Sequence, residues 1–354
     1  MAVMVRRRRT RRRLAGALAS AALLLTGAAM IDPTTSRADP PIDSGSNEEP
    51  PPEADSVKPT RAAIARVHTL SDRLLNVSVR SPAMERTVDV RVLLPERRDG
   101  PRPTVYMLDG RAAPPDSNDW IDKGDALAFF ADKPVNVVFP VGGRAAYYTD
   151  WQRPDPKLGT NRWETFLTEE LPPLLDARFA GNGANALTGV SMGAEAAMML
   201  AARKPGLYRA VGAHSGCYAM GSDFGEAQAR AVVGSYGGDP DNMFGPENDP
   251  EWTAHDVLAN AEALRGTAIY LSTGSGLPGE YDTPANPDWQ ETIAAGGPIE
   301  AGANLCTRDL AVRLAELGIP AAVEFRPTGT HSWPYWAAEL PRSWPTLASA
   351  LGVS

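Results

Sequence analysis

A single serine stands at the centre of the pentapeptide Gly189-Val190-Ser191-Met192-Gly193, between an apolar segment and an Ala-rich one. Glycine on both sides permits a sharp turn, because a Cβ at either position would clash with the neighbouring strand and helix. Such a turn presents the hydroxyl at the carboxyl edge of a parallel sheet and aims helix N–H groups at an oxyanion. We therefore predict that Ser191 is a nucleophile; the alternative is a serine that only caps a helix.

A nucleophilic serine needs a base, which is most often histidine. Only His331 follows the last predicted strand, as the chain order serine, acid, histidine requires. His68 precedes every predicted parallel strand, His255 lies in a polar stretch, and His214 follows a strand end that could lie near the site. We therefore predict that His331 is the base.

The acid that orients this histidine must lie between Ser191 and His331. By topology it follows the next-to-last strand, where Glu280 and Asp282 are nearest, and Glu300 lies further on at the start of a predicted helix. Spacing alone does not choose among the three.

Apolar segments alternate with helical ones through most of the chain. Segments 75–79 and 88–94 alternate in polarity and indicate an antiparallel pair at a sheet edge. Six compact apolar segments resemble strands buried on both faces, at 104–108, 135–139, 186–188, 210–213, 268–271 and 321–325. The helical stretches are 125–131, 163–179, 192–203, 257–264 and 304–317. This order predicts an α/β-hydrolase fold, with a central, mostly parallel sheet of eight strands flanked by helices.

The N-terminus has the features of an export signal. Arginines within residues 6–13 precede an apolar stretch, and Ser36-Arg37-Ala38 places small residues at both specificity positions of a cleavage site. We expect residues 1–38 to be a signal peptide removed near Ala38, with a retained membrane anchor as the alternative. Residues 39–61 are rich in Pro, Glu, Asp and Ser, which predicts a disordered leader. Residues 62–354 then form one catalytic domain.

Charge and cysteine usage narrow the class of protein. The chain has a net charge of −8, and loss of the eight arginines and one aspartate of the signal would leave about −15, which argues against nucleic acid as a partner. No cluster of Cys, His or carboxylates has metal-ligand spacing and no glycine-rich phosphate loop occurs, so we expect no metal and no cofactor. An exported chain with only two cysteines, Cys217 and Cys306, has usually paired them; the alternative is two buried thiols.

Seven segments between about residues 88 and 351 carry a resemblance to a known family. They are 106–110, 140–143, 148–151, 163–172, 189–192, 245–252 and 331–336. With these segments the chain resembles the mycolyltransferases of the antigen 85 type, secreted acyltransferases of mycolate-bearing actinobacteria, and most closely their corynebacterial-type branch. The resemblance implies that Ser191 is the nucleophile and His331 the base. Glu300 matches the family's acid, so the resemblance favours Glu300 over Asp282.

The resemblance also implies a substrate site. Backbone N–H groups of Met192 and Arg111 would form the oxyanion hole, Asp109 would grip a sugar hydroxyl, and Trp333 would wall a trehalose pocket. Ser215 matches a serine that forms hydrogen bonds within the site. Two plainer roles compete: Asp109 could cap a loop, and the tryptophans near His331 could be core packing. The family also follows Asp-Gly with Leu-Arg, whereas Arg111-Ala112 stands here, so acceptor preference could differ.

The implied function is acyl transfer outside the cell. Ser191 would take a mycolyl chain from trehalose monomycolate and pass it to a sugar hydroxyl of a second trehalose monomycolate or of cell-wall arabinogalactan. A secreted carboxylesterase that uses water on the same residues is one alternative, and a glycan-binding relative without catalysis is another.

Overall fold

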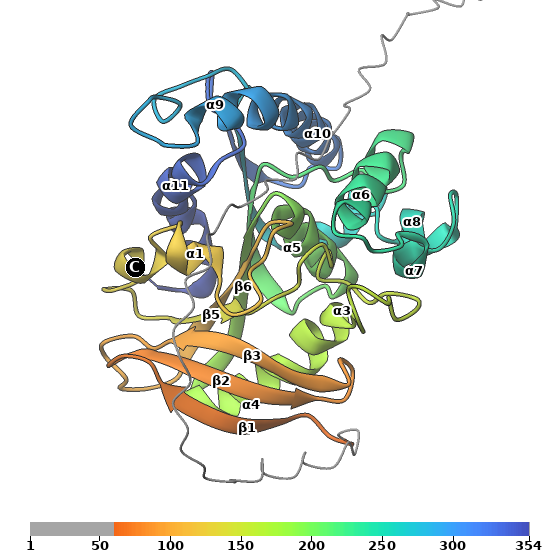
Figure 1. Cartoon of the computed structure of the whole chain (residues 1–354). Coiled ribbons are helices and arrows are strands. Elements are labelled where there is room, and N and C mark those ends of the chain that lie inside the picture. Colours follow the sequence, from red (N-terminus) through yellow and green to blue (C-terminus); the bar gives the residue numbers. More distant parts are fainter. Residues whose placement is uncertain (1–59, 354) are drawn as a thin grey trace, which may run out of the picture. The chain divides into compact units, whose positions relative to one another are not determined.

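A nine-stranded sheet runs through residues 60–353, the part of the chain that this computed structural model describes (Figure 1). Its spatial order is β1-β2-β3-β5-β4-β6-β7-β8-β9. The first three strands and β5 pair antiparallel, and every later pairing is parallel. The strands are β1 Ala63–Thr69, β2 Leu74–Ser81, β3 Arg86–Leu93, β4 Arg102–Leu108, β5 Asn136–Pro140, β6 Gly181–Val190, β7 Tyr208–His214, β8 Ala268–Thr273 and β9 Ala321–Phe325.

The α/β-hydrolase architecture agrees with the sequence prediction, but the predicted count of eight strands was wrong. The additional strand is β1, an edge strand that pairs only with β2 and carries a bulge between Ile64 and Arg66. No residue of β1 is fully buried, whereas β4 and β5 are buried throughout. An edge strand with little burial lacks the apolar run by which the central strands are found.

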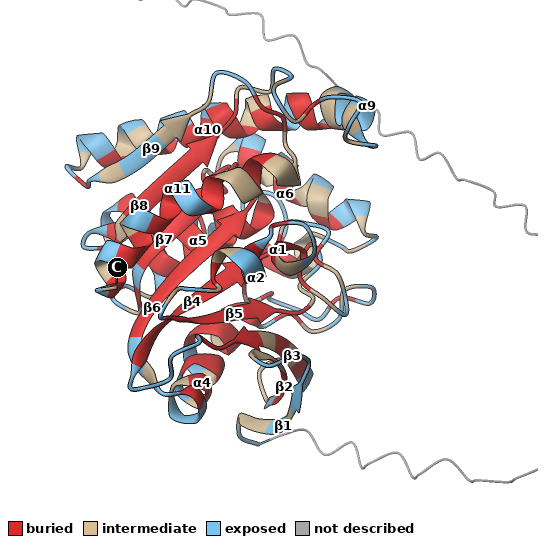
Figure 2. Ribbon diagram, turned by 90° about the vertical axis from the view of Figure 1, so that its left-hand side faces the viewer, coloured by how far each residue is buried: buried red, intermediate tan, exposed pale blue. Residues whose placement is uncertain are grey.

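Helices cover both faces of the sheet (Figures 1 and 2). On one face α4, α5 and α10 pack on the core, and on the other α1, α2 and α11 do so. Two π-helical segments, Phe166–Glu170 and Thr292–Gly296, and a 3₁₀ turn, Ala261–Leu264, complete the elements. The helices are α1 Asp119–Asp122, α2 Ala126–Phe129, α3 Trp163–Thr165, α4 Leu171–Phe179, α5 Met192–Arg203, α6 Asp223–Ser235, α7 Asp241–Phe244, α8 Pro250–Ala254, α9 Trp289–Glu291, α10 Gly297–Glu316 and α11 Trp333–Leu351.

The helix α5 has the bounds that the sequence predicted, and other helices differ. The helix α10 begins at Gly297 rather than Asn304, which puts Glu300 in its first turn. The helices α6 and α11 were not predicted; α11 holds Pro341 and Pro345 in its interior, a composition that normally ends a helix. Among the described residues, no helix has both the length and the apolar character to cross a membrane. The signal peptide and most of the leader lie outside the described residues.

Candidate active site

Ser191 occupies a strained turn between β6 and α5. It has φ 54° and ψ −126°, a conformation that residues with a side chain rarely adopt. Its N–H donates to the carbonyl of His214 over 2.8 Å, which ties the turn to the end of β7. This hydrogen bond helps to hold Ser191 in its strained conformation. The residue follows Val190, the last residue of β6, so its hydroxyl lies beyond the carboxyl end of that strand.

Both glycines of the pentapeptide are required by space. A Cβ on Gly189 would lie 2.1 Å from the carbonyl oxygen of Gly193, and a Cβ on Gly193 would lie 2.3 Å from that of Asp109. The atoms in the way belong to the backbone, which cannot move aside as the end of a flexible side chain can, so neither glycine can carry a side chain. The turn thus brings β6, α5 and the loop after β4 into direct contact, as the pattern of glycines predicted.

A chain of hydrogen bonds links Ser191, His331 and Glu300. The Nε2 atom of His331 lies 2.8 Å from the Oγ atom of Ser191, and its Nδ1 atom lies 2.8 Å from the Oε2 atom of Glu300. With the proton on Nδ1 held by the carboxylate, Nε2 is free to accept the serine proton. The three side chains come from a strand end, a loop and a helix, so the fold assembles the arrangement from distant segments.

Glu300 is fully buried and its second oxygen is held by three donors. Its Oε1 atom accepts hydrogen bonds from the Gly274 N–H at 2.6 Å, the Ser215 hydroxyl at 2.8 Å and the Thr273 hydroxyl at 3.1 Å. The guanidinium of Arg326 lies 3.7 Å from the same atom. A buried carboxylate with all these partners has little freedom to turn, and it presents Oε2 to His331.

Asp282, a rival candidate for the acid, serves the loop that carries His331. Its Oδ1 atom accepts a hydrogen bond from the Thr330 hydroxyl, and its Oδ2 atom accepts one from the Tyr335 hydroxyl, both at 2.6 Å. These partners flank His331 in the sequence, so Asp282 positions the loop. Glu280, the third candidate, is exposed and has no bond to His331.

The loop after β4 passes beside the nucleophile. A Cβ on Gly110 would lie 3.6 Å from the Cβ of Ser191, and Arg111, the next residue, has an exposed side chain. Met192 is the first residue of α5, and its sulfur accepts the N–H of Tyr147 at 3.4 Å. Gly110 and the N-terminus of α5 therefore both lie next to Ser191.

Asp109 does not present its carboxylate to this space. The residue is fully buried, and both of its carboxylate oxygens accept the N–H of Asp119, at 3.1 and 3.0 Å. Burial raises the pKa of Asp109 well above its usual range. The carboxylate thus has the loop-holding role that was set beside a sugar contact: it binds the N–H of the first residue of α1 and fixes the loop that carries Arg111.

Aromatic side chains surround the histidine. The Trp336 ring meets the His331 ring edge to face at 4.9 Å, and its Nε1 donates to the Ser215 hydroxyl at 3.0 Å. Trp333 is half-buried and meets Trp120 and Trp336 edge to face at 5.4 and 5.3 Å. Sequence reasoning missed Trp336, although its spacing from Trp333 at one turn of a helix was a usable signal.

The other histidines have structural environments. His214 is fully buried between the hydroxyls of Ser272 and Thr188, and burial lowers its pKa to about 4. His255 stacks on Phe244 at 4.0 Å, and burial lowers its pKa to about 3. His68 is exposed on β1. The structure brings only His331 to Ser191.

A disulfide joins Cys217, just beyond β7, to Cys306 in α10, as predicted. It links the helix that carries Glu300 to the segment that follows Ser215. Across residues 60–353, no group of three or more His, Cys, Asp or Glu side chains is placed to hold a metal ion.

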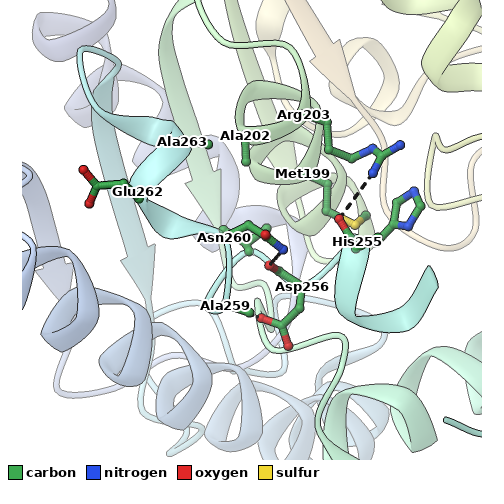
Figure 3. Close-up of a pocket in the computed structure, with 11 residues that line it drawn as sticks. Met199, Ala202, Arg203, His255, Asp256, Ala259, Asn260, Glu262 and Ala263 are labelled. Atoms are coloured by element: carbon green, nitrogen blue, oxygen red, sulfur yellow. Dashed lines mark hydrogen bonds between the residues drawn. The ribbon is translucent and has the colours of Figure 1, made fainter. Parts of the chain in front are cut away.

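A cavity of about 580 Å³ opens at the far end of α5, away from Ser191 (Figure 3). Two of its polar side chains, those of Arg203 and Asn260, are hydrogen-bonded within the protein. Arg203 donates to Glu164 and to the carbonyl of Ala254, and Asn260 donates to the carbonyl of Asp256. None of the residues that line it belongs to the hydrogen-bonded chain.

Residues 81–347 match a protein family described as "Putative esterase". Over 274 residues the chain is 34% identical to the diacylglycerol acyltransferase/mycolyltransferase Ag85B of Mycobacterium intracellulare. The alignment covers 75% of this chain and 80% of that protein. The crystal structure of Mycobacterium tuberculosis MPT51 (FbpC1) has 28% identity and a TM-score of 0.67, covering 79% of this chain and 100% of that one. An S-formylglutathione hydrolase from Agrobacterium tumefaciens, at 17% identity and a TM-score of 0.58, covers 82% and 100% and shares the fold.

Proposed function

The chain belongs to this esterase family and to its antigen 85 group of mycolyltransferases, and on that basis we propose that it is an exported serine acyltransferase. Its relatives support acyl transfer with esterase-like chemistry. The proposed reaction moves a mycolyl chain from trehalose monomycolate to the hydroxyl of a second trehalose monomycolate or of arabinogalactan. The observation that carries the proposal is the hydrogen-bonded chain Ser191–His331–Glu300.

The first half-reaction forms an acyl-enzyme. His331 takes the proton of Ser191 at Nε2 while the Ser191 oxygen attacks the ester carbonyl, which gives a tetrahedral intermediate. Collapse of the intermediate breaks the bond to the sugar oxygen, and His331 returns the proton to trehalose as it leaves. In the second half-reaction His331 deprotonates the acceptor hydroxyl, which attacks the acyl-enzyme and restores Ser191. Glu300 stabilises the imidazolium in both halves.

The negative charge of each intermediate needs donors that are in place beforehand. Met192 and Arg111 are the proposed donors, through their backbone N–H groups. The approach of Gly110 to Ser191 and the start of α5 at Met192 support this assignment. The fixed loop gives Asp109 its part in the reaction, because its bonds to the N–H of Asp119 hold the segment that leads to Arg111.

Two parts of the molecule are proposed to meet the sugar acceptor. Trp333 is half-buried next to Trp336, so it has free surface near His331. An indole packs well against the apolar face of a pyranose and helps to exclude water. The exposed side chain of Arg111 supplies donors for sugar hydroxyls in place of the carboxylate of Asp109.

Two experiments test the proposal. A fluorophosphonate probe should label the wild-type protein at Ser191 and fail to label Ser191→Ala, because only an activated serine reacts. Absence of labelling in the wild type would favour a glycan-binding protein without catalysis. Incubation with a trehalose ester and excess trehalose should then yield transesterified product. Free fatty acid as the main product would instead identify a carboxylesterase.

A further inference from the structure

A cavity of about 440 Å³ lies at the amino-terminal edge of the sheet, opposite the edge that carries Ser191. Its walls come from β1, β2, the start of β4 and the end of α4. The elements β1, β2 and α4 lie at the same end of the sheet in Figures 1 and 2. Three of its lining residues are arginines: Arg98, Arg102 and Arg178. We call this the arginine cavity.

The three guanidinium groups have no carboxylate partner in the described part of the chain. Arg98 donates to the carbonyls of Pro95 and Asp72, at 3.4 and 3.3 Å, and Arg102 donates twice to the carbonyl of Gly100, at 3.0 and 2.7 Å. Each guanidinium has five N–H donors, so most donors of this pair remain unused. The guanidinium carbon of Arg178 lies over the ring of Phe179, 5.5 Å from the ring centroid.

This lack of ion pairs is notable because the chain as a whole is acidic, with a net charge of −8. Other arginines do pair: Arg230 contacts Glu226 and Asp241, and Arg265 contacts Glu262. Arg102 is only 8% exposed, and a charged group taken from water without a counter-charge is costly. Asp72 is the one acid among the lining residues, which leaves a net positive cavity.

We propose that the arginine cavity binds a phosphate group. A phosphate oxyanion accepts two parallel N–H bonds from one guanidinium, a geometry that arginine provides and lysine does not. Three arginines around one space suit a single anion with several oxygen atoms. The remaining walls are mainly apolar, from Val67, Leu75, Leu94 and Phe179, which suits a phosphate that carries an apolar group. The ligand is either free phosphate or the headgroup of a phospholipid.

The test uses the full chain in two binding assays. Inorganic phosphate is titrated by calorimetry, and flotation is measured with phosphatidylcholine vesicles that contain or lack phosphatidylglycerol. The double variant Arg98→Gln/Arg178→Gln should weaken whichever binding occurs by about tenfold or more, because two charge-assisted contacts are lost. Both side chains are exposed, so the variant should fold with an unchanged melting temperature. Binding of inorganic phosphate alone would identify the free ion, and phosphatidylglycerol-dependent flotation the headgroup.

The matched control removes the same charge from another place. Arg80→Gln/Arg209→Gln changes two exposed arginines that do not line the cavity, and it should bind as the wild type does. Equal loss in the two double variants would show general electrostatic attraction and overturn the proposal. Failure of the wild type to bind in both assays would overturn it as well. Hydrolysis of a nitrophenyl ester should be unchanged in every variant, so the result is independent of the proposed acyl transfer.

Discussion

At the scale of single residues, two buried carboxylates near His331 have separate tasks. Glu300 meets the imidazole at 2.8 Å, whereas Asp282 holds Thr330 and Tyr335 on either side of it. Glu300→Gln should therefore lower kcat/KM for a nitrophenyl ester by about 10³-fold or more, because the imidazolium loses its counter-charge. Asp282→Asn should lower it far less, since an amide can still accept one of the loop hydrogen bonds. Steady-state kinetics of both variants decide this, and the opposite ranking would make Asp282 the acid.

Trp333 offers a second prediction, about the choice of acceptor. Trp333→Ala should depress acyl transfer to trehalose about tenfold more than hydrolysis of a small nitrophenyl ester, because the small ester needs no sugar surface. Product ratios at fixed trehalose concentration measure this effect. Asp109→Ala is the contrast: its carboxylate holds the loop, so both activities should fall together. Equal losses for Trp333→Ala would make that indole a packing residue.

A third buried acidic residue, Glu195 in α5, makes the stability of the fold depend on pH. Burial raises its pKa to about 8, and it accepts hydrogen bonds from the Cys217 N–H and from Gln228. The folded chain keeps this proton up to about pH 8, whereas an unfolded glutamate releases it near 4.5, so the carboxylate makes the free energy of unfolding fall as pH rises between these values. The slope is about 1.4 kcal/mol per pH unit at most.

Glu195→Gln should remove this slope and keep the acceptor for both donors. We expect its free energy of unfolding, from urea titrations between pH 5 and 8, to vary less with pH than that of the wild type. All other titrating groups are shared, so the difference between the two curves isolates Glu195. Parallel curves would mean that the carboxylate ionises in the fold at its ordinary pH.

At the scale of elements, the disulfide between Cys217 and Cys306 fastens α10, the helix that carries Glu300. It closes a loop of 89 residues, for which chain entropy gives a stabilisation of roughly 4–5 kcal/mol. Cys217→Ser/Cys306→Ser should lose stability of this order in urea titrations and lose activity at lower temperature than the wild type. Thiol titration of the unreduced, unfolded wild type should detect no free thiol; two reactive thiols would refute the bridge.

The elements also show what the sequence could predict and what it could not. Ser191 and His331 followed from a local pattern and from chain order. The acid did not, because Glu300 reaches the histidine from the first turn of α10 and Asp282 occupies the position where the acid is more often found. The helix α11 was missed for another reason: its packing on β6, β7 and β8 overrides the two prolines in its interior. The burial of Asp109 could not be predicted either, because a sequence motif does not show burial.

At the scale of the whole molecule, processing of the N-terminus is the remaining prediction. Removal of the proposed signal should leave a secreted chain that begins near Asp39. N-terminal sequencing and intact mass of the protein from the culture supernatant test this. A chain found only in the membrane fraction, with residues 1–38 intact, would instead support the anchor.

The strand β6 connects the arginine cavity, where we propose that phosphate binds, to the proposed nucleophile Ser191. Ala180, which lines the arginine cavity, precedes its first residue, and Ser191 follows its last. Ten residues of strand span about 33 Å. Attachment to an anionic surface through the cavity would hold Ser191 at a standoff comparable to the thickness of a bilayer core. A lipid still embedded in that surface could not reach the nucleophile, so the enzyme would act on chains that have already been extracted and delivered from the opposite side.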